Sequence, residues 1–554
     1  MKLVECVPNF SEGKDATILD AIAASIKAVK GVTLLDVDPG ETTNRTVFTM
    51  VGQPDNVVEA AFRAIKKAGE LIDMSKHHGA HARMGATDVC PFVPVSDMTM
   101  EECVELAKKL GKRVGEELDL PVYLYEYAAS KPEWQNLAEV RKGEYEALPE
   151  KMKDDYWKPD FGPQKFDAKR GATAIGAREF LIAYNINLNT RDKAKAHDIA
   201  LDIREKGRIK RDAKGKIVKD AKGKKVRTPG LFTHCKAVGW YIENFHKAQI
   251  SINLTNYKIT PAHVVLDKVR ELAAAKGLFV TGSEIVGLLP KAAMIESGKY
   301  YLKKMGEGAG IPERMIIETA IQSMGLRDVA EFDMDSKIIE YAIADKGKLA
   351  DMTLTQFADE LSTDSPAPGG GSVAALCSAM SGALTAMVAN LTAGKKGYEA
   401  HWDVARELAE AGQKIKERSL QAIDTDTQAF YDMVNAMRLP KKTDAEKAAR
   451  HTAIQDTTKN AILVPLETLE IALDAAIRAE KIAGIGNANA LSDAGVAAIN
   501  ANAAAKAAYL NVKINMSAIE DQEFKENILA KAEKLLNKVD TIALAVEADI
   551  KNRV

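Results

Sequence analysis

Apolar and polar residues repeat with two different periods along the first part of this chain. Residues 2–10 and 32–37 have the short apolar runs of strands, whereas residues 15–29 and 55–72 place apolar side chains at helical spacing. A further strand is expected at 47–51. Strands that alternate with helices in this way predict an α/β sandwich, in which helices cover a sheet.

The alternation weakens between residues 128 and 172, where Trp, Pro, Lys and Asp residues interrupt the pattern. It resumes with a strand at Phe180 to Tyr184 and continues to about residue 325. We therefore predict two α/β subdomains, 1–180 and 181–327.

The character of the chain changes after residue 351, because strand signals nearly vanish and Ala-rich amphipathic helices follow one another. This pattern predicts an all-α helix-bundle domain over 351–554, joined to the α/β part by a charged linker at 328–350. The fold class is thus multidomain, with two α/β sandwich subdomains followed by a helix bundle. Helices of the bundle are expected, for example, at 371–393, 403–436, 443–478 and 523–550.

Composition narrows the class of protein. The chain has 554 residues and a formal net charge of -2, which argues against nucleic acid as a partner of the whole chain. Its five cysteines are scattered and never form Cys-x-x-Cys, which disfavours disulfides and structural zinc and favours the cytoplasm. The N-terminus does not resemble a signal peptide, and no long uncharged apolar run predicts a membrane span.

One strongly basic segment, Lys206 to Arg227, contains eleven Lys or Arg residues and two Asp residues. Its quasi-repeat, RDAKGKIV followed by KDAKGKKV, predicts an exposed hairpin with turns at Gly215 and Gly223. The segment is either a solvated insertion or a basic arm that attracts a polyanionic substrate.

The first candidate site is the run His77 to Gly85, which places three histidines in a loop. A loop histidine titrates near neutral pH and can act first as a base and then as an acid. Arg83 is suited to holding a carboxylate, and Asp88 to orienting an imidazole. Structural histidines are the main alternative. Metal binding is disfavoured, because Gly79 breaks the helix that an i, i+4 pair of histidine ligands would need.

Two polar strand ends provide further candidates for this site. Asn9 lies in the turn that closes the first strand, while Asp38 and Arg45 flank the turn between the next two strands. Ligands tend to lie at strand ends in α/β layers. The alternative for each segment is a turn that satisfies its own backbone.

Long strings of this region carry a resemblance. LVECVPNFSEG, DVDPGETTNRTV, HHGAHARMGATDVCPFVPV and DFGPQKFDAKRGATAIGAREFLIAYNINL resemble the formiminotransferase domain family over residues 1–325. The resemblance implies that His81 is the catalytic acid–base. It also implies that folate is held partly by the segment from Asp160 to Gly171. The candidate binding residues in that segment are Asp160, Phe161, Gly162, Pro163 and Gly171.

The implied reaction transfers a formimino group from N-formimino-L-glutamate to tetrahydrofolate. An amine of the folate attacks the amidine-like carbon, a tetrahedral intermediate forms and glutamate leaves. One imidazole can accept the proton of the amine and return it to the glutamate nitrogen. We take Arg45 and Arg83 as the candidates that bind the substrate carboxylates.

The second candidate site is the turn Gly369, Gly370, Gly371 and Ser372, which opens a long Ala-rich helix. Such a turn either tightens the backbone or brings it against a ligand, and the start of a helix favours anions. The segment lacks the spacing of a P-loop.

Two further polar positions lie in the helical half. Asp424 and Asp426 are two residues apart on a predicted helix, so they face different directions and cannot form a close carboxylate pair. Asn487 and Asp493 lie in a polar break between helices and are candidate binding residues. The alternative for Asp493 is a helix N-cap.

The strings PAPGGGSVAA, DTDTQAF, GNANALSDAGVAA and YLNVKIN resemble the formimidoyltetrahydrofolate cyclodeaminase family over about 351–554. The resemblance implies ring closure to 5,10-methenyltetrahydrofolate with loss of ammonia, catalysed by a carboxylate in the Asp-x-Asp segment. We favour Asp424 over Asp426 for this role. It also implies that the helical half self-associates into a homo-oligomer.

Two unlike sites in regions of different composition predict a bifunctional enzyme. Tetrahydrofolate, in its monoglutamyl or polyglutamylated form, is expected as carrier substrate, with no metal or redox cofactor. Lys206 to Arg227 is a candidate for binding the polyglutamate tail. One alternative is a transferase whose helical half is a non-catalytic oligomerisation scaffold. Another is a non-catalytic folate-binding or structural protein.

Overall fold

The computed structural model describes residues 2–41, 43–79, 82–243, 246–344 and 349–554. The chain forms two compact units. The first consists of Met1–Ala293 and Met324–Ala344, and the second of Met294–Ser323 and Asp345–Val554. The sequence predicted domains over 1–180, 181–327 and 351–554 with a linker at 328–350, and that division stays a prediction. The two units are described separately below.

The first unit opens with a seven-stranded mixed sheet in the order β1-β4-β2-β5-β7-β6, with β3 paired to β4. Its antiparallel part is joined to the parallel strands β5, β7 and β6. The strands are β1 (Leu3–Cys6), β2 (Asn9–Phe10), β3 (Val32–Gly40), β4 (Arg45–Gly52), β5 (Thr87–Ser96), β6 (Val122–Glu126) and β7 (Thr173–Ala177).

The strand expected at 2–10 is split into β1 and β2 at Val7 and Pro8. Both pieces lie between β4 and β5, so they follow one another along the same line of the sheet. Pro8 has no N–H to give to the ladder, which explains the interruption.

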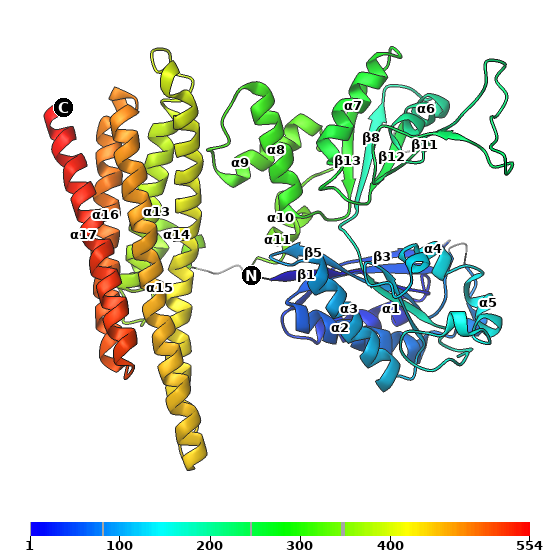
Figure 1. Ribbon diagram of the computed structural model, residues 1–554, viewed down its shortest axis with the longest axis horizontal. Helices are drawn as coiled ribbons and strands as arrows, with labels where there is room; N and C mark the ends of the chain where they lie inside the picture. Colours follow the sequence, from blue (N-terminus) through cyan, green and yellow to red (C-terminus); the bar gives the residue numbers. More distant parts are fainter. Residues whose placement is uncertain (1, 42, 80–81, 244–245, 345–348) are drawn as a thin grey trace. The chain divides into compact units, whose positions relative to one another are not determined.

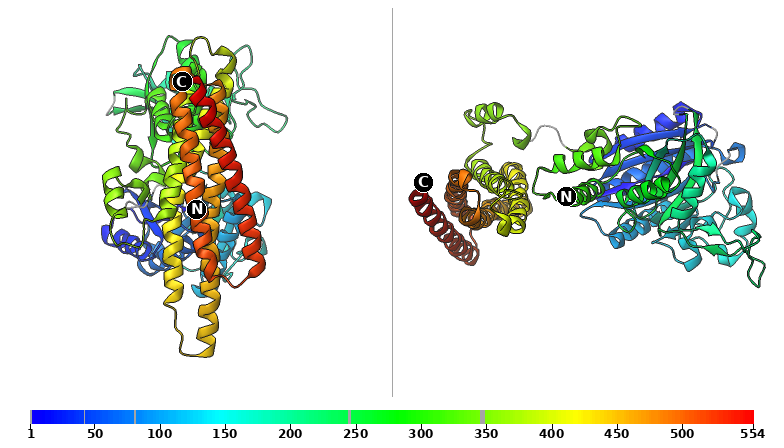
Figure 2. Two further views of the ribbon diagram at one scale, coloured as in Figure 1. Left: turned by 90° about the vertical axis from the view of Figure 1, so that its left-hand side faces the viewer. Right: turned by 90° about the horizontal axis from the view of Figure 1, so that it is seen from above.

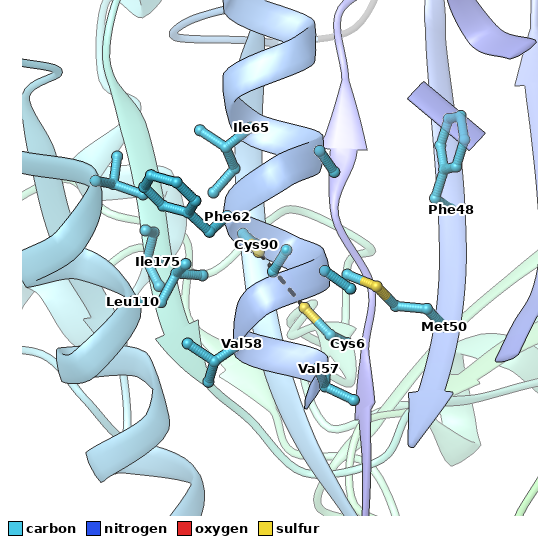
Figure 3. Packing of buried hydrophobic residues seen from close by; sticks show 14 of the residues in the cluster. Cys6, Phe48, Met50, Val57, Val58, Phe62, Ile65, Cys90, Leu110 and Ile175 are labelled. Carbon is cyan, nitrogen blue, oxygen red and sulfur yellow. Dashed lines mark hydrogen bonds between the residues drawn. The ribbon is translucent and has the colours of Figure 1, made fainter. Parts of the chain in front are cut away.

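Helices α1 (Ala16–Lys27), α2 (Pro54–Leu71) and α3 (Met100–Glu117) cover one face of this sheet (Figure 1). In Figure 3, Val58 and Ile65 of α2 lie over the buried Cys6 and Cys90 of β1 and β5. The regular apolar spacing that predicted 55–72 as a helix is therefore the face that builds this core.

The weakly patterned segment 128–172 folds into short helices against the opposite face. Its buried Trp134 and Leu148 pack with Tyr123 of β6 and Val89 of β5. The elements are η2 (Pro132–Gln135), α4 (Leu137–Val140), α5 (Glu144–Lys151) and η3 (Asp155–Trp157).

A second, four-stranded antiparallel sheet follows in the order β11-β12-β8-β13. Its strands are β8 (Ile182–Leu188), β11 (Cys235–Ile242), β12 (Lys247–Leu254) and β13 (Val280–Val286), packed against α6 (Lys193–Ile203) and α7 (Ala262–Ala274). Two short helices, α10 (Met334–Lys337) and α11 (Ile339–Ala342), return to this unit, where the amide of Ile339 donates to Leu289 O at 3.1 Å.

The basic segment forms a small antiparallel meander between β9 (Arg208–Ile209) and β10 (Arg227–Thr228). The expected turns occur at Gly215 and Gly223, both with positive φ. The carboxylates of Asp212 and Asp220 each accept two backbone N–H groups and so close the two turns. Its lysine side chains remain on an exposed arm (Figure 1).

The second unit is a bundle of long helices that run side by side (Figure 2, yellow to red). They are α13 (Gly370–Asn390), α14 (Trp402–Met437), α15 (Asp444–Ile485), α16 (Leu491–Asn515) and α17 (Gln522–Arg553), preceded by η5 (Leu349–Asp351) and α12 (Leu354–Leu361). Most of α8 (Lys291–Met305) and α9 (Glu313–Met324) also belong to this unit, and Asn390 donates to Gly310 O at 2.6 Å.

Small residues bring the central helices close together. A Cβ added at Gly382 of α13 would lie 2.7 Å from Gly412 O of α14, so only glycine permits this crossing. Among the described helices, α13 alone is long and apolar enough to span a membrane, yet 61% of its most apolar window is buried in the bundle. Its apolar character is thus explained by packing against α14 and α16.

Candidate functional sites

The first site is built on three neighbouring strands, β4, β2 and β5. Asn9 begins β2, Arg45 begins β4, and Asp88 is the second residue of β5. Arg45 Nε donates to Asn9 Oδ1 at 3.1 Å, and its guanidinium forms an ion pair with Asp88. The sequence placed these three residues near strand ends, and the structure brings them together.

A bulge aims Asp88 at this cluster. Asn9 is paired with Val89 and Phe10 with Thr87, so Asp88 is an extra residue that β2 does not oppose. Without the bulge Asp88 would share the helix-covered face of Cys90. With it, the carboxylate meets guanidiniums on the opposite face of the sheet.

Arg141, which directly follows α4, also forms an ion pair with Asp88. Both guanidiniums contact the same oxygen, Oδ2, while Oδ1 accepts the backbone N–H of Met84 at 2.9 Å. Asp88 is fully buried. No feature of the sequence had singled out Arg141, because its segment lacked a clear pattern.

A second cluster surrounds Arg83. Its guanidinium binds Glu146 at 2.6 Å and Glu144 at 3.2 Å, and its Nε donates to His77 Nδ1 at 3.3 Å. Hydrogen bonding to Glu146 raises the pKa of Arg83. Arg83 was a candidate for binding a carboxylate of the substrate, but it already has two carboxylate partners within the protein.

His77 has a structural role in this cluster. Its Nε2 lies 2.8 Å from the carbonyl oxygen of Asn44, and burial lowers its pKa. The Asn44 side chain links the same turn to the backbone of Gly13 and His78. The structural alternative for the histidines thus applies to His77, whereas His81 lies outside the residues that the structure describes.

Glycines fit the ends of this motif tightly into the fold. A Cβ at Gly79 would lie 2.2 Å from Thr43 O, and one at Gly85 would lie 2.4 Å from Ala172 O. Gly171, with a φ of +71°, pairs with Gly85 in an isolated bridge. The two segments implicated by the resemblance, 77–85 and 160–171, are therefore joined directly.

The segment that begins at Asp160 also completes the fold. Asp160 accepts the backbone N–H of Leu124 at 2.7 Å, and Phe161 lies against Gly111 and Gly115 of α3. Gly162 has a φ of +79°, a conformation that favours glycine, and Pro163 follows it. Asp38 is exposed on β3. It takes no part in the hydrogen bond between Asn9 and Arg45.

The second sheet carries a polar network that the sequence did not predict. Gln249 Nε2 donates to Asn187 Oδ1 at 2.8 Å and to Glu284 Oε1 at 3.0 Å, and Asn185 donates to the same carboxylate. The alternation of Asn185 and Asn187 with apolar residues on β8 was a signal that could have revealed it.

In the helical unit, the Gly-rich turn meets one carboxylate. Ser372 Oγ donates to Asp426 Oδ2 at 3.1 Å, and a Cβ at Gly371 would lie 2.1 Å from Asp426 Oδ1. Burial raises the pKa of Asp426. Asn511 of α16 lies on the other side, since its Nδ2 would be 3.3 Å from a Cβ at Gly370. The sequence missed Asn511, which lies in the YLNVKIN string.

Asp424 points elsewhere, as expected for residues two apart on a helix. Its Oδ1 accepts the backbone N–H of Leu349 at 2.9 Å, at the start of η5. Of the two aspartates, Asp426 is therefore the one that contacts the Gly369 to Ser372 turn.

Asn487 and Asp493 lie away from that turn. Asn487 accepts Lys395 Nζ at 3.0 Å and donates to Leu391 O, beyond the C-terminal end of α13. The Gly-rich turn is at the other end of this helix, which is about 30 Å long at 1.5 Å per residue. Asp493 is in the first turn of α16, whose N-cap is Ala490, so it is not the cap.

Metal ligation has no geometric support in the part of the chain that the structure describes, where no three His, Cys, Asp or Glu residues are grouped to hold an ion. The side chains that are grouped instead suit carboxylates and proton transfer, through guanidiniums in the first unit and a buried carboxylate in the second.

Comparisons with known proteins cover the whole chain. Residues 3–178 match the family model "Formiminotransferase domain, N-terminal subdomain", residues 183–344 match "Formiminotransferase domain" and residues 353–534 match "Formiminotransferase-cyclodeaminase". A formimidoyltransferase-cyclodeaminase of Dictyostelium discoideum is 42% identical over 100% of this chain and 99% of its own length.

Two shorter relatives correspond to the two halves. A glutamate formimidoyltransferase of Streptococcus pyogenes serotype M1 is 44% identical over 54% of this chain and 94% of its own length. A methenyltetrahydrofolate cyclohydrolase of Methylorubrum extorquens is 38% identical over 36% of this chain and 97% of its own length.

Proposed function

The chain belongs to the formimidoyltransferase-cyclodeaminase family, and from this we infer that its two halves catalyse two consecutive steps on one folate. It is both a glutamate formimidoyltransferase and a formimidoyltetrahydrofolate cyclodeaminase. The first step moves the formimino group of N-formimino-L-glutamate to tetrahydrofolate and releases glutamate. The second step closes the ring to 5,10-methenyltetrahydrofolate and releases ammonia.

We assign the proton transfers of the first step to His81. The amine of the folate loses a proton as it attacks the formimino carbon, and the glutamate nitrogen gains one as it leaves. One imidazole can do both if its loop is held in place. The close approach of Gly79 to Thr43 and the hydrogen bond from the Met84 amide to Asp88 hold the described residues of this motif in place. They lie on either side of His81 in the sequence.

The folate is expected to lie against the segment from Asp160 to Gly171. The direct bridge between Gly171 and Gly85 supports this assignment, because it ties that segment to the histidine loop.

For the second step, the geometry favours Asp426 as the catalytic carboxylate. The neighbouring folate nitrogen attacks the carbon of the protonated formimino group and gives up a proton, and the formimino nitrogen receives one further proton and leaves as ammonia. A partly buried carboxyl with a raised pKa is suited to both transfers near neutral pH. The contact between Asp426 and Ser372 is the observation that carries this assignment, because it joins the acidic residue to the Gly-rich turn.

The experiment is to mix the purified protein with formiminoglutamate and tetrahydrofolate. Glutamate, ammonia and the near-ultraviolet absorbance of the methenyl product are followed together. All three signals are expected in the wild-type protein. Glutamate without ammonia would support the alternative in which the helical half is only a scaffold. Loss of glutamate release in His81→Ala is required of the proposed acid–base residue.

We also propose that the protein self-associates, that it is cytoplasmic and that it needs no metal. Self-association through the helical half is supported by exposed apolar residues on α16, among them Val496, Ile499, Leu510 and Ile514. Free cysteines in the described structure support the cytoplasm as its compartment. The reaction needs no metal or redox cofactor and no nucleic-acid or membrane partner, since proton transfer and carbon–nitrogen chemistry account for both steps.

A further inference from the structure

The Asp88 cluster carries more positive than negative charge. Arg45 and Arg141 both form ion pairs with Asp88, and they share a single carboxylate oxygen. Asn9, the other side chain in the cluster, is neutral. Among the residues that the structure describes, these two guanidiniums share one carboxylate, which leaves an excess of one positive charge.

This charge is held in a buried place. The side chains of Arg45 and Arg141 are only 9% and 13% exposed. Burying a charge without a counterion is costly, and burial accordingly lowers the pKa of Arg45. Nε of Arg141 is fully buried and has no hydrogen-bond partner in the structure. The cluster thus has an excess positive charge, and one of its guanidiniums has an unpaired donor.

The neighbouring Arg83 shows the opposite balance. It is surrounded by Glu144 and Glu146, so two carboxylates face one guanidinium. An anionic ligand would be repelled by this pair unless both glutamates moved. Arg83 is therefore not suited to binding an anion, whereas the pair Arg45 and Arg141 is.

We propose that Arg141, together with Arg45, binds a carboxylate of the amino-acid substrate, and that Arg83 does not. The assignment rests on the proposed transferase activity. The carboxylate would supply the missing negative charge and accept from the free donors of the two guanidiniums. Planar, paired N–H groups are suited to this task.

The position of the cluster suits a substrate that reacts at the histidine loop. Asp88 Oδ1 accepts the Met84 amide, three residues after His81, so the cluster and the loop share a hydrogen bond. A carboxylate held at Arg141 would anchor the non-reacting end of formiminoglutamate at a cluster that is hydrogen-bonded to Met84 of the same motif.

The test compares Arg141→Gln with wild-type protein in glutamate release. The KM for formiminoglutamate should rise roughly tenfold to a hundredfold, the range expected when charge-assisted hydrogen bonds are lost. The KM for tetrahydrofolate should change less than about twofold. Lys142→Gln removes the next cation along the chain, which is exposed, and is the matched control.

The variant should fold, because removing Arg141 leaves Arg45 and Asp88 as a balanced pair. Ammonia release from presupplied formimidoyltetrahydrofolate reports an intact second unit, and binding of L-glutamate, measured by calorimetry, reports the subsite without turnover. Arg141→Lys should recover part of the glutamate affinity.

An unchanged KM for formiminoglutamate in Arg141→Gln would overturn the proposal, and so would a rise confined to tetrahydrofolate, whose own glutamate also carries carboxylates. If wild-type protein released no glutamate at all, the proposed transferase activity itself would be wrong, and the proposal for Arg141 would lose its basis.

Discussion

The hydroxyl of Ser372 on α13 donates to the carboxylate of Asp426 on α14 at 3.1 Å, across a separation of 54 residues. This contact places the carboxylate of Asp426 against the Gly-rich turn, whereas Asp424 accepts a hydrogen bond from the amide of Leu349. The two aspartates of one short motif thus have different tasks.

Asp426→Asn should lower ammonia release by roughly 10²- to 10⁴-fold, the usual range for loss of a general acid–base group. Glutamate release should be unchanged. Asp424→Asn is the matched control and should retain most of the ammonia release, since Asp424 Oδ1 accepts from a backbone amide at the start of η5 and not from the Gly-rich turn. The reverse ranking of the two variants would return the catalytic role to Asp424.

Gly371→Ala should act like a mild form of the same loss. The added Cβ would lie 2.1 Å from Asp426 Oδ1, so either the turn or the carboxylate must move. We expect ammonia release to fall at least tenfold, while glutamate release is unaffected. Gly369→Ala is the control, because no atom lies within 4 Å of a Cβ there. Equal ammonia release by the two variants would show that catalysis does not depend on the position of the Asp426 carboxylate.

Ser372→Ala should change the pH profile of ammonia release. Burial raises the pKa of Asp426, and the hydrogen bonds from Ser372 partly offset that rise. Loss of the hydroxyl removes part of the offset, so the pKa rises further. The acidic limb of kcat/KM should move up by roughly half to one pH unit. Ser381→Ala, which removes another buried hydroxyl of α13, should leave the limb in place.

Gly79→Ala should impair the transferase selectively. Its Cβ would lie 2.2 Å from Thr43 O, which is backbone and cannot swing away. Forcing atoms into such a space costs about 1–3 kcal/mol. We expect a slower release of glutamate with normal ammonia release from presupplied formimidoyltetrahydrofolate. Normal activity in both assays would mean that the histidine loop tolerates displacement.

Glu5→Gln should stabilise the first unit at high pH. Glu5 is 4% exposed, and burial raises its pKa to about 7, well above its usual 4.5. A carboxyl with a raised folded pKa favours folding below pH 4.5 and loses that contribution as the pH rises through 7.

The amide variant should therefore melt at a higher temperature than wild type at pH 8, where the loss is complete. The two proteins should melt at similar temperatures at pH 5. Glu101→Gln, on the exposed surface of α3, is the control at both pH values. A Tm difference that did not depend on pH would exclude titration of Glu5 as the cause.

Local pattern was sufficient for much of this protein. The apolar spacing of α2 and the alternation of β4 reflect which face of each element is buried, so they can be read without knowing the neighbours. The Ala-rich, strand-free second half likewise predicted a helix bundle. The motif strings indicated both activities through their resemblance to two families.

Only the tertiary structure decided which side chains meet. Asp88 reaches Arg45 and Arg141 because of a bulge in the pairing of β2 and β5, and a one-residue irregularity of that kind has no signal in the apolar pattern. The sequence favoured Asp424 over Asp426, whereas the contacts favour Asp426, because α13 packs against α14 at Asp426 and η5 meets α14 at Asp424. The sequence sets the faces of the elements, while contacts between distant segments determine the charge balance and chemistry of each site.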